Sequence, residues 1–256
     1  MQDAGSFRIA VPASVASVFL FALVTAVATG LGAVPFVLAR HPTRKWLGVS
    51  NAIAAGLMLA ASFGLIYEGV DYGLSRTLAG ALLGLIFIVI ARQVLQHEEH
   101  PVVFASMGSL DAKKALLIVG VMTVHSFTEG VGLGVSFGGG QALGLFITLA
   151  IAVHNVPEGL AISLVLVPRG VGWSRAAAWS VFSSLPQPLM AVPAFVFVEA
   201  FRPLLPYGLG FAAGAMVWMV FSELVPDALD EASSNLVAVV ITLSVAAMIA
   251  FQVLIR

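Results

Sequence analysis

The sequence has no cysteine and very few charged residues. The lack of cysteine excludes disulfide bonds, thiolate metal ligands and cysteine nucleophiles. Charged residues make up 10% of the 256 positions, whereas an ordinary soluble domain carries roughly 25%, and no basic tract offers a surface for nucleic acid. Hydrophobic residues account for 60% of the chain. These proportions predict an all-α integral membrane protein whose surroundings are the lipid bilayer.

The apolar residues fall into stretches of about 20 residues or more, the length that a helix needs to cross a ~30 Å hydrocarbon layer. Short connectors rich in glycine, proline and charge separate them. The apolar run after the N-terminal "MQDAGSFRIAVP" is too long for the core of a signal peptide, so it counts as the first span. Eight transmembrane helices are predicted, at about 14–39, 47–70, 74–96, 114–136, 141–167, 174–200, 206–227 and 235–255.

Lysine and arginine are distributed unevenly between the two sides of the predicted bundle. With the N-terminus outside, the inside connectors carry eight of these residues and the outside segments four. The positive-inside rule then favours both termini outside. The acidic connector around Asp230 has no basic residue, but acidic residues count little in that rule. We therefore expect a multi-pass protein of the plasma (inner) membrane with both termini outside.

Two short apolar sequences each occur twice, with the same separation along the chain. Pro35 in "AVPFV" and Pro193 in "AVPAFV" are 158 positions apart, and so are Met58 in "AAGLM" and Met216 in "AAGAM". The shift covers five spans, an odd number, so the second copy would cross the membrane in the opposite direction. Folds with such inverted repeats bind their substrate near mid-membrane, at the repeat interface. The prediction is one transporter domain, 1–256, with helices grouped three, two and three: 1–96, 113–167 and 173–256.

The fourth and fifth predicted spans each contain a His-x-x-x-Glu-Gly motif, "HSFTEG" and "HNVPEG". Positions i and i+4 lie on one face of a helix, so His125 stacks with Glu129, and His154 with Glu158. The two spans form a hairpin around "GGGQ", and the histidines are 14 residues before and 15 residues after its centre. They are therefore expected to face each other at one depth. Pro157 is expected to kink the fifth span and tilt Glu158 towards the other three.

Two imidazoles and two carboxylates at mid-membrane are suitable ligands for a divalent transition metal. An acidic residue at the centre of a membrane helix costs roughly 2.5–3.5 kcal/mol, and no lysine or arginine lies centrally in any predicted span to offset it. A metal or a proton must therefore neutralise the carboxylates. A purely structural His–Glu contact would explain one motif, but duplication at matching depth favours a functional site.

Two other classes of membrane protein also bury histidine and glutamate. An intramembrane metalloprotease needs His-Glu-x-x-His, which is absent, so no enzyme is expected. A proton-coupled channel or pump could use the His/Glu pairs as a proton relay without a metal, and it remains the alternative function. Metal-dependent thermal stabilisation of the purified protein distinguishes the two readings.

The pair of motifs resembles the fourth- and fifth-helix signatures of the ZIP family of divalent metal ion transporters. The similarity extends to "TGLGAVP", "AAGLMLAASF" and "AAGAMVWMVFSELVPDA" in the first, second and seventh spans. It implies eight helices, both termini outside, and transport of Zn²⁺, or alternatively Fe²⁺ or Mn²⁺, into the cytoplasm. The metal is then a substrate rather than a prosthetic group, and a homodimer is compatible with the resemblance.

The resemblance also implies a ligand set. His125, Glu129, His154 and Glu158 correspond to the primary metal ligands. Met58 corresponds to a second-helix position that can complete this site, although an apolar packing role explains it equally well.

Many members of the family have a second, adjacent metal position. It uses the residue after each histidine, here Ser126 and Asn155, and a sixth-helix carboxylate, where this chain has Gln187. All three side chains are neutral, so we expect this second position to be weak, transient or absent.

Polar residues at the ends of the spans are candidates for entry and exit. Glu68 and Asp71 end the second span on the predicted outside, and Glu223 lies near the predicted cytoplasmic end of the seventh. A solvated helix end is the alternative role for the first two. The segment "HEEH" at 97–100 is interpreted as a charged loop tip.

Overall fold

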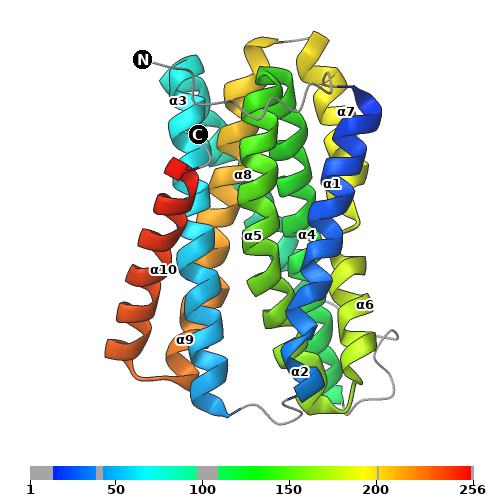
Figure 1. The fold of residues 1–256 in the computed structure, drawn as a ribbon, viewed down its shortest axis with the longest axis vertical. Coiled ribbons are helices and arrows are strands. Elements are labelled where there is room, and N and C mark those ends of the chain that lie inside the picture. The colour runs from blue at the N-terminus through cyan, green and yellow to red at the C-terminus, as the bar shows by residue number, and fades with distance from the viewer. Residues whose placement is uncertain (1–13, 39–42, 97–108, 201, 255–256) are drawn as a thin grey trace, which may run out of the picture.

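The computed structural model describes residues 14–38, 43–96, 109–200 and 202–254, and within these ranges every element is a helix and no strand occurs. The segment at 97–100 lies outside the described residues. The helices run roughly parallel to one long axis of the molecule (Figure 1). The prediction of an all-α protein is confirmed. The helices are α1 (Val15–Gly30), α2 (Pro35–Leu38), α3 (Arg44–Gln96), α4 (Ser109–Gly139), α5 (Gln141–Leu166), α6 (Trp173–Ser184), α7 (Pro186–Ala200), α8 (Leu205–Met219), α9 (Val225–Glu231) and α10 (Ser234–Leu254).

Short irregular turns join several of these helices. Three 3₁₀ turns lie between α1 and α2, after α5 and before α8, and a π-helical turn, Val220–Leu224, joins α8 to α9. By length and apolar composition, six helical stretches in the described residues can cross a membrane. They are Val15–Val37, Arg44–Val94, Gln141–Arg169, Trp173–Val198, Leu205–Glu231 and Ser234–Leu254.

The longest stretch, α3, is two helices joined at Gly73. This glycine has φ 149° and ψ 104°, a left-handed conformation that residues with a side chain rarely adopt. Gly69 precedes this point and Thr77 follows it. The two residues lie so close together that a Cβ added to Gly69 would be 2.8 Å from the methyl carbon of Thr77. Residues eight positions apart in a continuous helix would be separated by ~12 Å. The chain therefore reverses at Gly73, at the boundary predicted between 47–70 and 74–96.

Glycine allows the helices to approach closely. Gly80 and Gly84, in the second half of α3, lie directly against the backbone of α8. Gly56, in the first half, lies against the backbone of α10, where an added Cβ would be 2.6 Å from the carbonyl oxygen of Ile241. Membrane helices gain little from hydrophobic burial against each other, so close van der Waals packing of small residues holds them together. The first half of α3 is thus bordered by α10 and the second half by α8.

The two motif helices, α4 and α5, lie in the middle of the bundle between α1, α7 and α8 (Figure 1). In the most apolar part of the α5 span, 61% of the residues are buried inside the protein. In α10, at the edge of the bundle, the corresponding share is 22%. Polar groups are costly in lipid, so the enclosed helices are the ones that can carry them.

Candidate metal site

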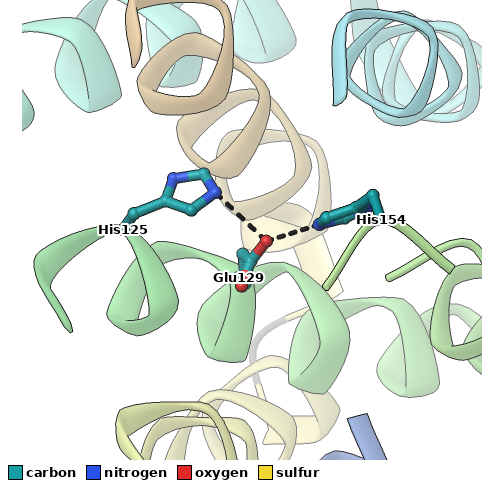
Figure 2. A group of neighbouring side chains, drawn as sticks. All are labelled: His125, Glu129 and His154. Atoms are coloured by element: carbon teal, nitrogen blue, oxygen red, sulfur yellow. Dashed lines mark hydrogen bonds and ion pairs between the residues drawn. The ribbon is translucent and has the colours of Figure 1, made fainter. Parts of the chain in front are cut away.

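Three motif side chains meet at the centre of the bundle. His125 and Glu129 project from α4 and His154 from α5, and all three are buried (Figure 2). Glu129 Oε1 lies 2.5 Å from His154 Nε2 and 3.1 Å from His125 Nε2. One ligand atom from each residue fits within 4.8 Å of the other two, which is the geometry that a single cation could bridge. The structure therefore brings the two histidines together from opposite arms of the hairpin.

Glu158 is not part of this group of three. It is fully buried on α5, yet it is not among the residues whose ligand atoms come within 4.8 Å of one another. The α5 helix continues through Pro157, from Gln141 to Leu166, and the tilt of Glu158 towards the other three residues stays a prediction. Neither of its carboxylate oxygens has a hydrogen-bond partner.

The two motifs contain an unusual concentration of unsatisfied polar atoms. In the described part of the chain, eight buried side-chain nitrogen and oxygen atoms lack a hydrogen-bond partner, and seven of them belong to the motifs. Such an atom costs about 1–3 kcal/mol and is rare in folded proteins. A cation bound through one nitrogen of an imidazole and through a carboxylate oxygen would satisfy some of these atoms. The seven atoms are His125 Nδ1 and Nε2, Ser126 Oγ, His154 Nδ1, Asn155 Oδ1 and both carboxylate oxygens of Glu158. Of these, His125 Nε2 makes the 3.1 Å ion-pair contact with Glu129 Oε1 but no hydrogen bond.

A chain of neutral side chains supports Glu129 from the other side. Gln187, at the start of α7, donates from Nε2 to Glu129 Oε2 at 2.5 Å. Its Oε1 accepts from the Thr25 hydroxyl at 2.7 Å and from Asn155 Nδ2 at 3.2 Å. Asn155 Nδ2 also donates to the Thr25 carbonyl at 2.8 Å. Gln187 therefore links α1, α4 and α5 at the candidate metal site.

The three residues of the predicted second metal position are only partly brought together. Gln187 and Asn155 are hydrogen-bonded to each other, whereas Ser126 is buried with its hydroxyl oxygen unpaired. Thr25 was not predicted from the sequence. Its hydroxyl also lies 2.7 Å from the Ala22 carbonyl of its own helix, the usual role of threonine in an apolar helix, so no sequence feature distinguishes it.

Met58 is fully buried within an apolar cluster that includes Met122 and Met219. Met122 precedes His125 by three positions on α4, so this cluster lies next to the site. The position is compatible with both readings of Met58.

A cavity of about 470 Å³ lies at the end of the bundle where α3 begins and where α5 and α9 end. Its lining includes Val121, one helical turn before His125, and Ala161, about one turn after Glu158. Glu223 lines it and is paired with Arg92, whose Nε lies 2.6 Å from Glu223 Oε1. The cavity therefore extends from about one helical turn beyond the motif residues to the end of the bundle where α3 begins.

The two residues predicted for ion entry lie near the C-terminal end of the first half of α3, away from this cavity. Glu68 is half-buried beside the reversal at Gly73, and Asp71 is exposed there. Their role in ion entry stays a prediction.

Comparison with known proteins points to one family. The family model described as the ZIP zinc transporter matches residues 92–251. A putative zinc transporter of Arabidopsis thaliana is 50% identical over 244 residues, which cover 94% of this chain and 39% of that protein. The zinc transporter GufA of Myxococcus xanthus is 33% identical over 80% of this chain and 85% of its own length. The zinc transporter ZIPB of Bordetella bronchiseptica is 31% identical over 78% and 69%. The chain thus spans about two fifths of the plant relative and most of the two bacterial ones.

Proposed function

The chain belongs to the ZIP zinc transporter family, and from this premise we propose that it moves a divalent transition-metal ion, Zn²⁺ in the first place, across the membrane into the cytoplasm. The observation that carries the proposal is the buried group of His125, Glu129 and His154 with the unpaired Glu158 one turn away. Two imidazoles and carboxylate oxygens are ligands that Zn²⁺ prefers, at ~2.0–2.2 Å. Fe²⁺ and Mn²⁺ accept the same ligand types and are the other candidate substrates.

The unsatisfied atoms favour a cation over a proton relay. A relay would account for the short contact between Glu129 and His154. It would leave the carboxylate of Glu158, the amide oxygen of Asn155 and the hydroxyl of Ser126 without partners. A metal with three or four protein ligands, completed by water, accounts for more of these groups.

The site is proposed to hold one ion at a time. Gln187 donates to the second oxygen of Glu129, the oxygen that a neighbouring ion would need. The other members of the second position, Ser126 and Asn155, bring no charge. A second divalent ion would therefore meet the repulsion of the first without any additional anion to offset it.

Eight spans arranged as an inverted repeat remain part of the proposal, and two close contacts support it. Gly130, the last residue of the first motif, lies against the backbone of Gln187, where an added Cβ would be 2.6 Å from the carbonyl oxygen. Gly159, the last residue of the second motif, lies against the carbonyl oxygen of Thr29. Thr29 and Gln187 are 158 positions apart, which is the separation between the two copies of each recurring apolar sequence. Equivalent glycines thus contact equivalent positions of α1 and α7.

The cavity supports release of the ion at the end where α5 and α9 terminate. By the distribution of basic residues this end faces the cytoplasm, with both termini outside. The plasma (inner) membrane and a homodimeric assembly complete the proposal. Loading from the outside then requires a rearrangement that closes this cavity and opens the opposite end, as in other transporters with inverted repeats.

The test compares metals directly in the purified full chain. Uptake of radioactive Zn²⁺, Fe²⁺ and Mn²⁺ into proteoliposomes is measured with and without a pH gradient, and thermal unfolding is followed with and without each metal. We expect uptake of Zn²⁺ and a rise in Tm, because a ligand at 100 times its Kd stabilises the folded state by about 2.7 kcal/mol. Glu158→Gln removes one charge without changing size and is expected to lower uptake at least tenfold.

Ser136→Ala is the matched control for this substitution. Ser136 is also a buried polar residue, on α4, and its hydroxyl donates to the Leu133 carbonyl of its own helix. Its removal should leave uptake near wild type. Normal uptake in folded Glu158→Gln would contradict the site assignment, and pH-driven proton flux without any metal effect would favour the relay.

A further inference from the structure

Thr25, on α1, contacts the two amide side chains beside the candidate metal site. Its hydroxyl lies 2.7 Å from Gln187 Oε1, and its backbone carbonyl accepts from Asn155 Nδ2 at 2.8 Å. Asn155 Nδ2 also donates to Gln187 Oε1 at 3.2 Å. All three side chains are fully buried, so bulk water does not replace a partner that is lost. One residue of α1 therefore holds both amides, through its side chain and through its backbone.

The single proton of the Thr25 hydroxyl has two acceptors within reach. One is Gln187 Oε1 and the other is the Ala22 carbonyl, also at 2.7 Å. The Ala22 carbonyl lies inside α1, where the N–H four positions later is its regular partner. The other donor to Gln187 Oε1, Asn155 Nδ2, lies farther away than the hydroxyl. Loss of the Thr25 hydroxyl therefore weakens the hold on the Gln187 amide.

These contacts fix which end of the Gln187 amide faces the carboxylate of Glu129. Gln187 Nε2 donates to Glu129 Oε2 at 2.5 Å, while Gln187 Oε1 faces its two donors. A reversed amide would place its oxygen against the carboxylate and its NH₂ group against the NH₂ group of Asn155. Buried polar groups that face a like group instead of a partner are costly. The Thr25 hydroxyl thus favours the orientation in which Gln187 donates to Glu129.

The two oxygens of Glu129 consequently have different surroundings. Oε1 lies 2.5 Å from His154 Nε2 and 3.1 Å from His125 Nε2, on the side of the candidate metal ligands. Oε2 accepts from Gln187, and this hydrogen bond competes with a cation for the same oxygen. Glu129 is thereby held as a ligand that offers one oxygen. Together with one nitrogen from each histidine, it leaves one of the four positions around a Zn²⁺ ion for a further ligand.

We propose that Thr25 is a positioning residue for metal selectivity: through Gln187 it keeps Glu129 to one metal-binding oxygen and so favours Zn²⁺ over Mn²⁺. Zn²⁺ in proteins usually takes four ligands in a tetrahedron, whereas Mn²⁺ prefers an octahedron of oxygen ligands. A Glu129 that is free to bind through both oxygens raises the number of ligands and adds oxygen, which suits Mn²⁺ better. Thr25 contributes no ligand and acts through Gln187. The inference rests on the proposed transport function.

The test compares Thr25→Val with Thr25→Ser in the purified full chain. Valine keeps the shape of threonine and removes the hydroxyl, whereas serine keeps the hydroxyl. Affinities for Zn²⁺ and Mn²⁺ are measured by calorimetry, and uptake is measured in proteoliposomes supplied with both ions. We expect the ratio of Zn²⁺ to Mn²⁺ affinity to fall by roughly threefold to tenfold in Thr25→Val, the range that one buried hydrogen bond contributes. The uptake ratio should fall with it, and Thr25→Ser should keep both ratios near wild type.

Thr29→Val is the matched control. Thr29 is a fully buried threonine one turn further along α1, and its hydroxyl is paired with the Ser184 hydroxyl at 2.8 Å. The same chemical change at this position should leave the Zn²⁺ to Mn²⁺ ratio unchanged, even if the Tm falls. Should Thr25→Val not fold, Thr25→Ala takes its place, because it also lacks the hydroxyl and is expected to lower the ratio to the same extent.

An unchanged ratio in folded Thr25→Val would overturn the inference. An equal loss of affinity for both ions would do so too, because it marks a structural role only, and so would a fall of the same size in Thr29→Val. A wild type that neither binds nor transports Zn²⁺ would refute the transport function itself. A wild type that transports Zn²⁺, with the same ratio in every variant, would refute only the role of Thr25.

Discussion

In the proposed site, Gln187 is the residue that limits the number of bound ions to one. It donates to Glu129, and its own oxygen accepts from Thr25 and Asn155, so its amide is fixed in one orientation. The donated hydrogen bond holds Glu129 with its other oxygen towards the two histidines. Under the proposed function, a glutamine here supports the ligand of the first ion and occupies the place where a second ion would bind.

Gln187→Glu should convert this neutral position into a metal ligand. Two carboxylates would then face each other at a distance of about one hydrogen bond, and an unpaired buried charge costs roughly 3–5 kcal/mol. We expect a lower Tm without metal, two bound Zn²⁺ ions by calorimetry instead of one, tighter apparent affinity and slower turnover. Gln252→Glu, on α10, adds a charge outside the site and should leave the number of ions unchanged. One ion with wild-type affinity in Gln187→Glu would place this residue outside the site.

At the scale of helices, the position of α5 depends on its contact with α1. Gly159 lies against the Thr29 carbonyl with no space for a Cβ. The same pair of helices is joined by the hydrogen bond from Asn155 to the Thr25 carbonyl. A change in the distance between α1 and α5 therefore disturbs the side chains that support the metal ligands.

Gly159→Ala should push α1 away from α5. Overpacking of this kind costs roughly 1–3 kcal/mol, and we expect a Tm lower by several degrees and weaker Zn²⁺ binding. Gly130→Ala should behave alike if the two helices belong to an inverted repeat, because Gly130 makes the equivalent contact with Gln187. Gly172→Ala is the control, since an added Cβ there meets no atom within 4 Å and its φ of −60° suits alanine. Equal stability of Gly159→Ala and Gly172→Ala would show that the close contact is not required.

At the scale of the whole molecule, the natural absence of cysteine allows the orientation to be tested directly. Tyr72 is exposed beside the reversal at Gly73, and Asp230 is exposed at the mouth of the cavity. Five predicted spans separate them. They are therefore expected on opposite sides of the membrane.

Tyr72→Cys should react with a membrane-impermeant maleimide in intact cells, because it faces the outside in the proposed orientation. Asp230→Cys should react only after the membrane is permeabilised. The unmodified chain, which has no thiol, is the background control. Labelling of both positions from the outside would contradict the odd number of spans between them, and the reversed pattern would place the termini and the cavity on the other sides.

The sequence alone determined that the protein is an all-α membrane protein, that two of its helices carry the motifs, and that the two histidines face each other. These follow from local geometry: apolar length sets a span, helical periodicity puts Glu129 over His125, and a hairpin of nearly equal arms brings His154 to the same depth. The reversal at Gly73 was predicted for a similar reason, since polar residues interrupt the apolar run beside it. How far Pro157 tilts Glu158 towards the other three ligands stays a prediction, because the angle of a proline kink depends on what packs around it.

Contacts between helices that are not neighbours in the chain were decided only by the tertiary structure. The pairing of Arg92 with Glu223, and the hydrogen bonds from Thr25 and Asn155 to Gln187, join different helices of the bundle. Such contacts depend on how each helix is rotated about its own axis. In a soluble protein an apolar face fixes that rotation, but these helices are apolar on nearly every side, so their composition specifies the membrane and leaves the rotation to close packing of glycines and to buried hydrogen bonds.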